Sequence, residues 1–193
     1  SAQTLHITDS PNLHCSDTVA VFSPRTSGRN LPTLFLLHGY SGDYKNWNKY
    51  VDVQELADRS GFRIICPDGH YNSWYLNNAD PSKMQWRTFF WEELWPWAEE
   101  EYGLEPGKTF ITGLYMGGPG AINIYLDHPE RFKGAGSMSG VLALKHSGGS
   151  KDYIPLILGE TDIESQACTD ASATYRLEAY SAAHGEQHKD KVF

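Results

Sequence analysis

The feature that most constrains the fold is a glycine-bracketed turn near the middle of the 193-residue chain. A β-branched and aromatic run, Thr109–Thr112, leads into Gly113-Leu114-Tyr115-Met116-Gly117. An apolar run, Ala121–Leu126, follows closely. This succession predicts a strand, a sharp turn and a helix. Small residues then lie on both sides of one protruding side chain, that of Tyr115.

Two apolar runs before this turn predict further strands that are buried on both faces. The runs are Thr33–Leu37 and Phe62–Cys66, and Phe132–Met138 predicts the next strand after the turn. Two segments between them, Val51–Ala57 and Phe89–Tyr102, predict helices, and Pro96 is expected to kink the second or delay its start. Thr4–Thr8 and Thr18–Phe22 predict two short strands before the first run. The alternation of strand and helix favours an α/β fold with a mostly parallel sheet and helices on both faces.

Length and composition fit a single domain over residues 1–193. The net charge is −8, and no cluster of Lys or Arg occurs, which argues against a nucleic-acid or anionic-membrane partner. No apolar run approaches the ~20 residues of a membrane span. Cys15, Cys66 and Cys168 lack the spacing of a zinc site or a disulfide framework, so we expect neither metal nor cofactor, and Cys66 is predicted to be buried. The chain opens at Ser1 without Met, which favours a processed or trimmed product and leaves a cytoplasmic and a secreted location open.

Ordered motifs recur along the first three quarters of the chain. They are Leu36–Gly42 with Asn46-Trp47, Pro67-Asp68-Gly69, Thr112–Ala121 and Phe132–Gly140. Together they resemble the esterase D / tributyrin esterase group of α/β-hydrolases, which includes carboxylesterases and feruloyl or acetyl-xylan esterases. The resemblance covers residues 5–142, and residues 143–193 diverge. It implies an α/β-hydrolase fold and hydrolysis of small carboxylic esters by a Ser-His-Asp triad.

The resemblance also implies positions for the site. The central turn corresponds to the nucleophile elbow G-x-S-x-G, so Tyr115 stands where the family has its serine. The backbone N–H groups of Tyr40 and Met116 would form the oxyanion hole, with support from the dipole of the following helix. From the residues themselves, two interpretations of the long aromatic loop that contains Trp74, Tyr75 and Trp86 stay open: these side chains line an acyl or sugar pocket, or they pack the loop onto the sheet.

Tyr115 predicts that the chain is inactive as written. A phenol ordinarily has a pKa of ~10, the sequence offers it no neighbouring base, and its ring fills the space that an acyl group needs. Ser41 and Ser139 are interpreted as loop hydroxyls. Two classes of function remain: an esterase-family protein with an inactivated site, and a non-catalytic protein that binds a ligand or partner on the same fold.

The catalytic acid and base have two interpretations. In the first, Ile154–Leu158 is a strand, Asp162 is the acid, and His184 or His188 is the base. This interpretation would also permit an active esterase with an unorthodox nucleophile.

In the second interpretation, Glu178–His184 is a connecting helix and Lys191–Phe193 begins the strand that carries the acid. The chain then stops before both groups, and the fold is incomplete at its C-terminus. We favour it because this helix-to-strand pattern fits the family better. For the non-catalytic protein, a sheet edge left uncovered in this way predicts homodimerisation or poor solubility.

Overall fold

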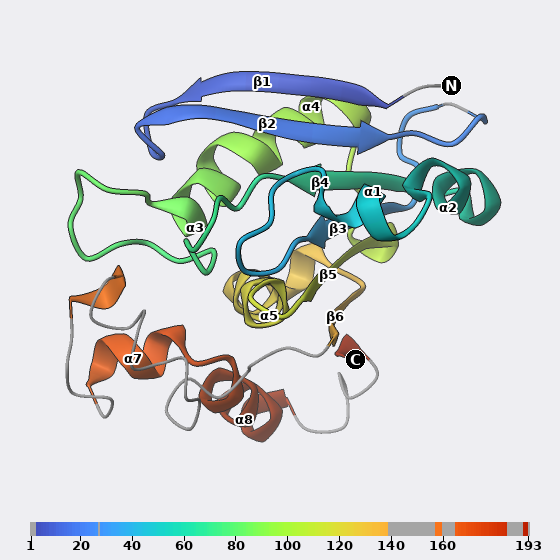
Figure 1. Ribbon diagram of the computed structural model, residues 1–193. Helices are drawn as coiled ribbons and strands as arrows, with labels where there is room; N and C mark the ends of the chain where they lie inside the picture. Colours follow the sequence, from blue (N-terminus) through green and yellow to red (C-terminus); the bar gives the residue numbers. More distant parts are fainter. Residues whose placement is uncertain (1–2, 27, 139–156, 160–164, 185–190, 193) are drawn as a thin grey trace.

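A six-stranded sheet forms the centre of the computed structural model, which describes residues 3–26, 28–138, 157–159, 165–184 and 191–192 (Figure 1). The strand order is β1-β2-β4-β3-β5-β6. The strands are β1 (Thr4–Ser10), β2 (Cys15–Phe22), β3 (Thr33–Leu37), β4 (Arg63–Pro67), β5 (Thr109–Leu114) and β6 (Gly134–Met138). β3 to β6 pair in parallel, while β1 pairs antiparallel with β2 and β2 with β4. The predicted α/β class and mostly parallel sheet are therefore confirmed.

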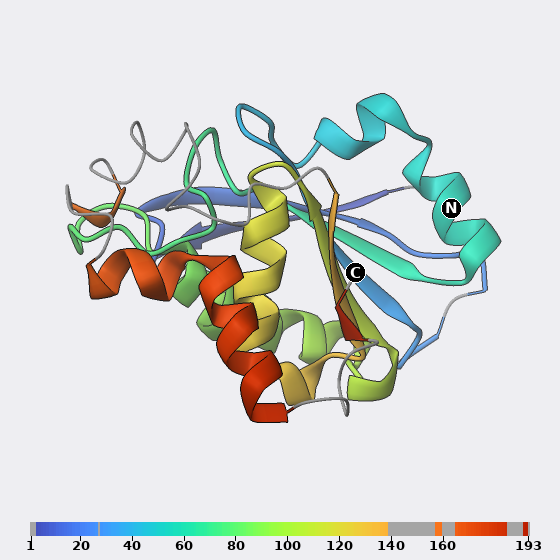
Figure 2. The same cartoon turned by 90° about the horizontal axis from the view of Figure 1, so that it is seen from below.

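Helices cover both faces of the sheet (Figures 1 and 2). They are α1 (Asn46–Tyr50), α2 (Val53–Ser60), α3 (Trp86–Phe89), α4 (Trp95–Tyr102), α5 (Gly117–Asp127), α7 (Gln166–Ala171) and α8 (Ala173–His184). Successive strand residues point to opposite faces, so Phe35 packs in the core with α3, α4 and α5 while Leu36 packs in the core with α2. Cys66, 2% exposed, lies in the second core, and burial raises the pKa of its thiol to about 12. Its prediction as a small buried hydrophobe is confirmed.

The helical stretch around Pro96 starts earlier than the sequence indicates, at Trp86. A π-helical turn, Phe90–Leu94, joins α3 to α4, and the N–H of Trp95 donates to the carbonyl of Phe90 five residues back. Pro96, which has no N–H, lies in the first turn of α4, directly after the π turn. The π turn keeps Phe90 and Leu94 buried, 0% and 2% exposed.

The last described segments return the chain to the outer edge of the sheet. α8 packs on α5, and the tyrosine hydroxyls of Tyr125 and Tyr180 lie 3.0 Å apart. Further along, Val192 forms an isolated parallel bridge with Ala135 of β6. Val192 thus lies where a further parallel strand would pair with β6.

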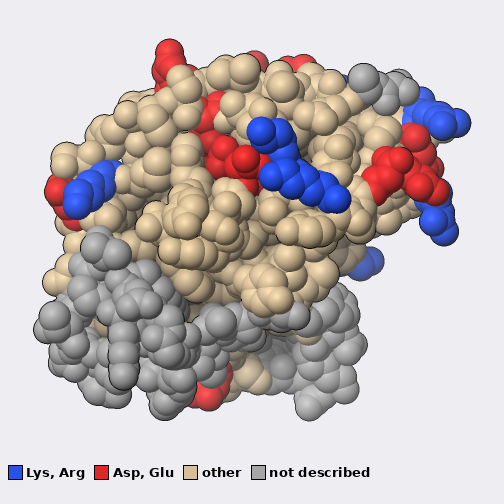
Figure 3. All heavy atoms as spheres, viewed as in Figure 1, with Lys and Arg blue, Asp and Glu red and all other residues tan. Residues whose placement is uncertain are grey.

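Charged side chains of both signs are interspersed on the face seen in Figure 3, where Lys and Arg lie beside Asp and Glu and form no continuous basic patch among the described residues. Within the same part of the chain, no helix combines the length and apolar character needed to cross a membrane.

The crossing of β5 and α5 depends on two glycines. A Cβ on Gly113 would overlap the carbonyl oxygen of Gly117. A Cβ on Gly117 would lie 2.6 Å from the carbonyl oxygen of Leu37 in β3. The backbone of α5 therefore touches β5 and the end of β3 directly, at a separation that side chains would prevent.

We predict that Gly113→Ala lowers the free energy of unfolding by at least ~2 kcal/mol, because a backbone atom must move to admit the methyl group. Gly107→Ala is the matched control, since a Cβ there meets no atom of a described residue within 4 Å. Urea unfolding of both variants measures the difference. Equal stabilities would show that the crossing is not tight.

Candidate functional site

The loops that follow β3, β4 and β5 meet at the carboxyl edge of the parallel strands. Five of the seven described non-glycine residues with positive φ lie in these loops: Ser41, His70, Trp74, Tyr75 and Tyr115. The left-handed region costs an L-residue roughly 1–2 kcal/mol. Strained backbone of this kind clusters at functional sites, which makes this edge the candidate site.

The turn between β5 and α5 presents Tyr115 to solvent. Its φ is +51°, and its side chain is 56% exposed. The N–H of Tyr115 donates to the carbonyl of Met138 at the end of β6, and the N–H of Gly118 donates to the carbonyl of Tyr115. The turn is thus tied to the neighbouring strand and to the start of α5. Met116 behind it is completely buried.

The β3 loop, residues 38–45, lies against this turn. A Cβ on Gly39 would come 3.2 Å from the carbonyl oxygen of Leu114 and 3.5 Å from Cβ of Tyr115. The next residue, Tyr40, is therefore adjacent to the turn. The backbone N–H groups of Tyr40 and Met116 donate to no described residue.

His38 joins the β3 loop to the β4 loop, residues 68–85. The ring is 1% exposed, and its Nε2 accepts a hydrogen bond from the N–H of Gly69 at 2.8 Å. Nδ1 therefore carries the proton, which it donates to the carbonyl of Gly39 at 2.8 Å. A second link is the hydrogen bond from the N–H of Ser41 to the carbonyl of Tyr71. Both loops are held as one unit.

Tyr75 supports this unit from below. Its side chain is completely buried, its hydroxyl donates to the carbonyl of His38 at 2.8 Å, and its ring meets Trp86 edge-on at 4.6 Å. A Cβ on Gly120 of α5 would overlap the ring. Of the two interpretations of Tyr75, the structure matches packing of the loop onto the core.

Other aromatic side chains remain at the surface beside the turn. The ring centre of Tyr40 lies 5.1 Å from that of Tyr71 and 6.4 Å from that of Trp74. Tyr40 and Tyr71 are 51% and 59% exposed, and Trp74 is partly buried. Together with Tyr115, these side chains form the aromatic surface of the site.

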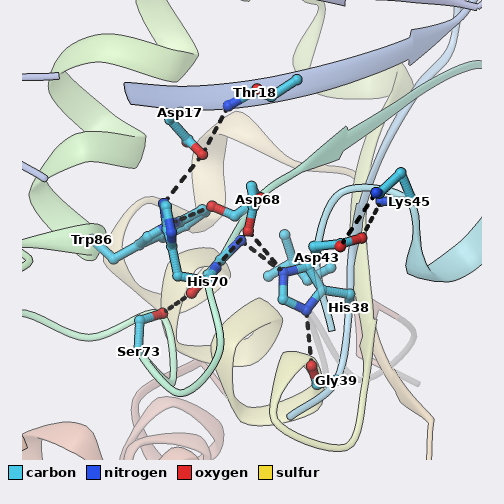
Figure 4. A network of polar contacts seen from close by, with 12 residues as sticks. Asp17, Thr18, His38, Gly39, Asp43, Lys45, Asp68, His70, Ser73 and Trp86 are labelled. Atoms are coloured by element: carbon cyan, nitrogen blue, oxygen red, sulfur yellow. Dashed lines mark hydrogen bonds and ion pairs between the residues drawn. The ribbon is translucent and has the colours of Figure 1, made fainter. Parts of the chain in front are cut away.

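A polar cluster lies at the base of the β4 loop (Figure 4). Asp17 of β2 points toward His70, with 3.3 Å between Oδ1 and Nε2, and the N–H of His70 donates to Asp68 at 2.7 Å. Burial raises the pKa of the Asp17 carboxyl to about 6, against the effect of its contact with His70. Burial acts to lower the pKa of His70, but the two carboxylates raise it above its ordinary value.

Sequence reasoning missed this cluster. Pro67-Asp68-Gly69 was recognised as one of the motifs of the resemblance, but no role was assigned to its side chains, and nothing marked Asp17. The antiparallel register that pairs Val19 with Pro67 places Asp17 beside the residues that follow β4. Such a pairing between residues far apart in the chain leaves no local pattern, although the Asp-Gly-His sequence after a buried strand is the one available signal.

The structure does not describe the side chains of the candidate acid and base, Asp162, His184 and His188. Asp162 and His188 lie outside the described part of the chain, and so do Ser139 and most of Ile154–Leu158. His184 is the last residue of α8, and its side chain is likewise not described. Their roles stay predictions.

Comparisons with known proteins agree with this architecture. Residues 10–189 match the family model described as "Putative esterase". An acetyl esterase of Caldicellulosiruptor saccharolyticus is 33% identical over 135 residues, which cover 68% of this chain and 50% of that protein. The diacylglycerol acyltransferase/mycolyltransferase Ag85A of Mycobacterium tuberculosis is 31% identical over 127 residues, 61% of this chain and 38% of that protein. The chain thus matches half or less of these relatives' length.

The fold is also found in solved structures. An S-formylglutathione hydrolase from Agrobacterium tumefaciens superimposes with a TM-score of 0.82 at 22% identity, over 92% of this chain and 70% of that one. At this identity the likeness concerns the fold alone.

We predict that Tyr75→Phe lowers the free energy of unfolding by about 1–3 kcal/mol, because the buried carbonyl of His38 loses its hydroxyl donor. Tyr71→Phe, at an exposed position, should change it by less than ~0.5 kcal/mol. Chemical denaturation of both variants tests this. A Tyr75→Phe protein as stable as Tyr71→Phe would contradict the assigned role of the hydroxyl.

Proposed function

Because this chain belongs to the esterase family matched over residues 10–189, we propose that its central turn is the family's nucleophile elbow with tyrosine in the serine position. The observation that carries the proposal is the backbone of Tyr115, a bulky residue held at φ +51° between β5 and α5. A strained strand-to-helix turn that points one side chain outward is what an elbow requires. The side chain of Tyr115 is 56% exposed, so its own packing gives no reason for this left-handed backbone.

The proposed oxyanion hole comprises the N–H groups of Tyr40 and Met116. Two features support it: neither group donates to a described residue, and the β3 loop packs directly on the turn. Met116 precedes α5, so the positive end of the helix dipole adds to the attraction for a developing oxyanion. An ester carbonyl placed beside residue 115 would meet both donors.

Tyr115 prevents the acyl transfer that such donors serve. A serine hydroxyl attacks the ester carbonyl from a short side chain while a histidine removes its proton. The phenol oxygen of tyrosine lies several bonds farther from the backbone than a serine hydroxyl. It therefore cannot reach the carbonyl carbon of an ester whose carbonyl oxygen is bound by the two N–H groups. We therefore propose that this esterase-family protein, with tyrosine at position 115, does not hydrolyse esters.

We predict no hydrolysis of p-nitrophenyl acetate and no fluorophosphonate labelling by the wild-type chain. Tyr115→Phe, which removes only the phenol oxygen, is the matched control and should behave identically. Hydrolysis by the wild type that disappears in Tyr115→Phe would overturn the proposal, because it would make Tyr115 the nucleophile.

Tyr115→Ser separates the two interpretations of the acid and base. Ester hydrolysis by this variant would support Asp162 with His184 or His188 as the acid and base. Its absence, in a variant that folds normally by circular dichroism, would leave those residues without a catalytic role. Label on Ser41 or Ser139 would instead locate a nucleophile outside the turn.

The aromatic surface favours a second function, binding of a small ester without turnover. Tyr40, Tyr71 and Tyr115 are each more than half exposed around the proposed oxyanion hole, and flat aromatic side chains suit the stacking of an aryl acid. An aryl ester should quench tryptophan fluorescence saturably in the wild type, and at least ~10-fold more weakly in Tyr40→Ala. Equal quenching in Tyr50→Ala and Tyr40→Ala would contradict a specific site, since Tyr50 lies on α1 and is 72% exposed.

A further inference from the structure

Asp17, Asp68 and His70 each offer a ligand atom to one small volume, and the three atoms lie within 4.8 Å of one another. They come from two elements that the sheet brings together: Asp17 from β2, and the other two from the start of the β4 loop (Figure 4). The cluster is distinct from the turn at Tyr115 and is not used by the proposed function.

The Asp17 carboxylate is incompletely satisfied. Its side chain is completely buried, Oδ1 accepts from the N–H of Thr18 at 3.0 Å, and Oδ2 has no hydrogen-bond partner among the described residues. A buried carboxylate oxygen without a donor is costly, because it loses its hydration and gains nothing in return. The other oxygen of the same carboxylate, Oδ1, faces Nε2 of His70.

The contact between Asp17 and His70 is also imperfect. The 3.3 Å between Oδ1 and Nε2 exceeds the ~2.7–2.9 Å of a charge-assisted hydrogen bond. Nε2 is buried and has no partner of hydrogen-bond geometry among the described residues. Two buried polar atoms therefore face each other without bonding well.

The same separation suits two ligands of one metal ion. Zinc bonded tetrahedrally at ~2.0–2.1 Å to nitrogen and oxygen keeps neighbouring ligand atoms ~3.3 Å apart. Two carboxylates and one imidazole are a ligand set for zinc and similar divalent transition metals. The side chains of Asp68 and His70 are 15% and 24% exposed, so two of the three ligand residues reach the surface.

We propose that Asp17, Asp68 and His70 form a divalent transition-metal site, selective for Zn²⁺ over Mg²⁺, that ties β2 to the β4 loop. The ion would bind Oδ2 of Asp17, or both oxygens of that carboxylate. A carboxylate oxygen of Asp68 and the neutral imidazole of His70 would be the other protein ligands, and water would take the remaining position. Because the β4 loop is bonded to the β3 loop through His38 and Ser41, the site would stiffen the edge on which Tyr115 lies.

Calorimetric titration of the full chain with Zn²⁺, after treatment with a chelator and its removal, tests the proposal. We expect one ion per chain, a rise in the melting temperature on Zn²⁺ addition, and no comparable effect of Mg²⁺. Co²⁺ should give the visible absorption bands of a tetrahedral site. His70→Gln should weaken Zn²⁺ binding at least ~10-fold and abolish the rise in melting temperature.

Matched variants distinguish this site from adventitious binding. His128→Gln is the control, because His128 also lies 3.2 Å from a carboxylate oxygen, that of Glu130, but the described residues supply no third ligand there. It should bind Zn²⁺ as the wild type does. Asp68→Asn should reproduce the loss seen in His70→Gln, and because its side chain is partly exposed, it provides a readout if Asp17→Asn fails to fold.

Two results would overturn the proposal. One is the absence of Zn²⁺ binding by the folded wild type at ~100 μM ion. The other is binding that survives unchanged in folded His70→Gln and Asp68→Asn, which would place the ion elsewhere.

Discussion

The direct contact between the backbones of β5, α5 and β3 is the constraint on which the candidate site depends. Without side chains at Gly113 and Gly117, the first turn of α5 lies against the carbonyls at the end of β3. This approach leaves the chain no room for a gradual bend, so residue 115 takes a left-handed conformation and points outward. The β3 loop then packs on the turn, and Tyr75 fills the space beneath both. The backbone strain at Tyr115 thus follows from the close contact of β5, α5 and β3. It does not depend on the chemistry of the tyrosine side chain.

Much of the fold could be predicted because its strands are buried on both faces. Runs such as Thr33–Leu37 and Phe62–Cys66 have no other stable place in a chain of this size, and the glycines beside Tyr115 marked the turn. Element boundaries were less accurate. The start of the helix at Trp86 and the π turn before Pro96 depend on how the aromatic side chains pack, which local sequence does not encode.

Some residues of the site could be predicted and others could not, again because local sequence does not encode long-range packing. Tyr115, Tyr40 and Met116 lie on loops next to recognisable strands, so their neighbourhood follows from strand order. Asp17 gains its partners only through the antiparallel pairing of β2 with β4. Buried polar clusters assembled by long-range pairing leave almost no trace in sequence, although they decide how loops at a sheet edge are held.

Asp127, the last residue of α5, connects three helices. Its carboxylate accepts from Arg87 of α3 and Arg176 of α8, and also from the indole N–H of Trp91. Burial acts to raise the pKa of Asp127, but the two arginines hold it below its ordinary value, so the carboxylate keeps its charge in mildly acidic solution. One carboxylate thus links α3 to α8, in addition to the contact of α8 with α5 at Tyr125 and Tyr180. A protein cut or shortened before α8 would therefore leave Asp127 with Arg87 and Trp91, and the earlier part of the fold would still keep its own ion pair.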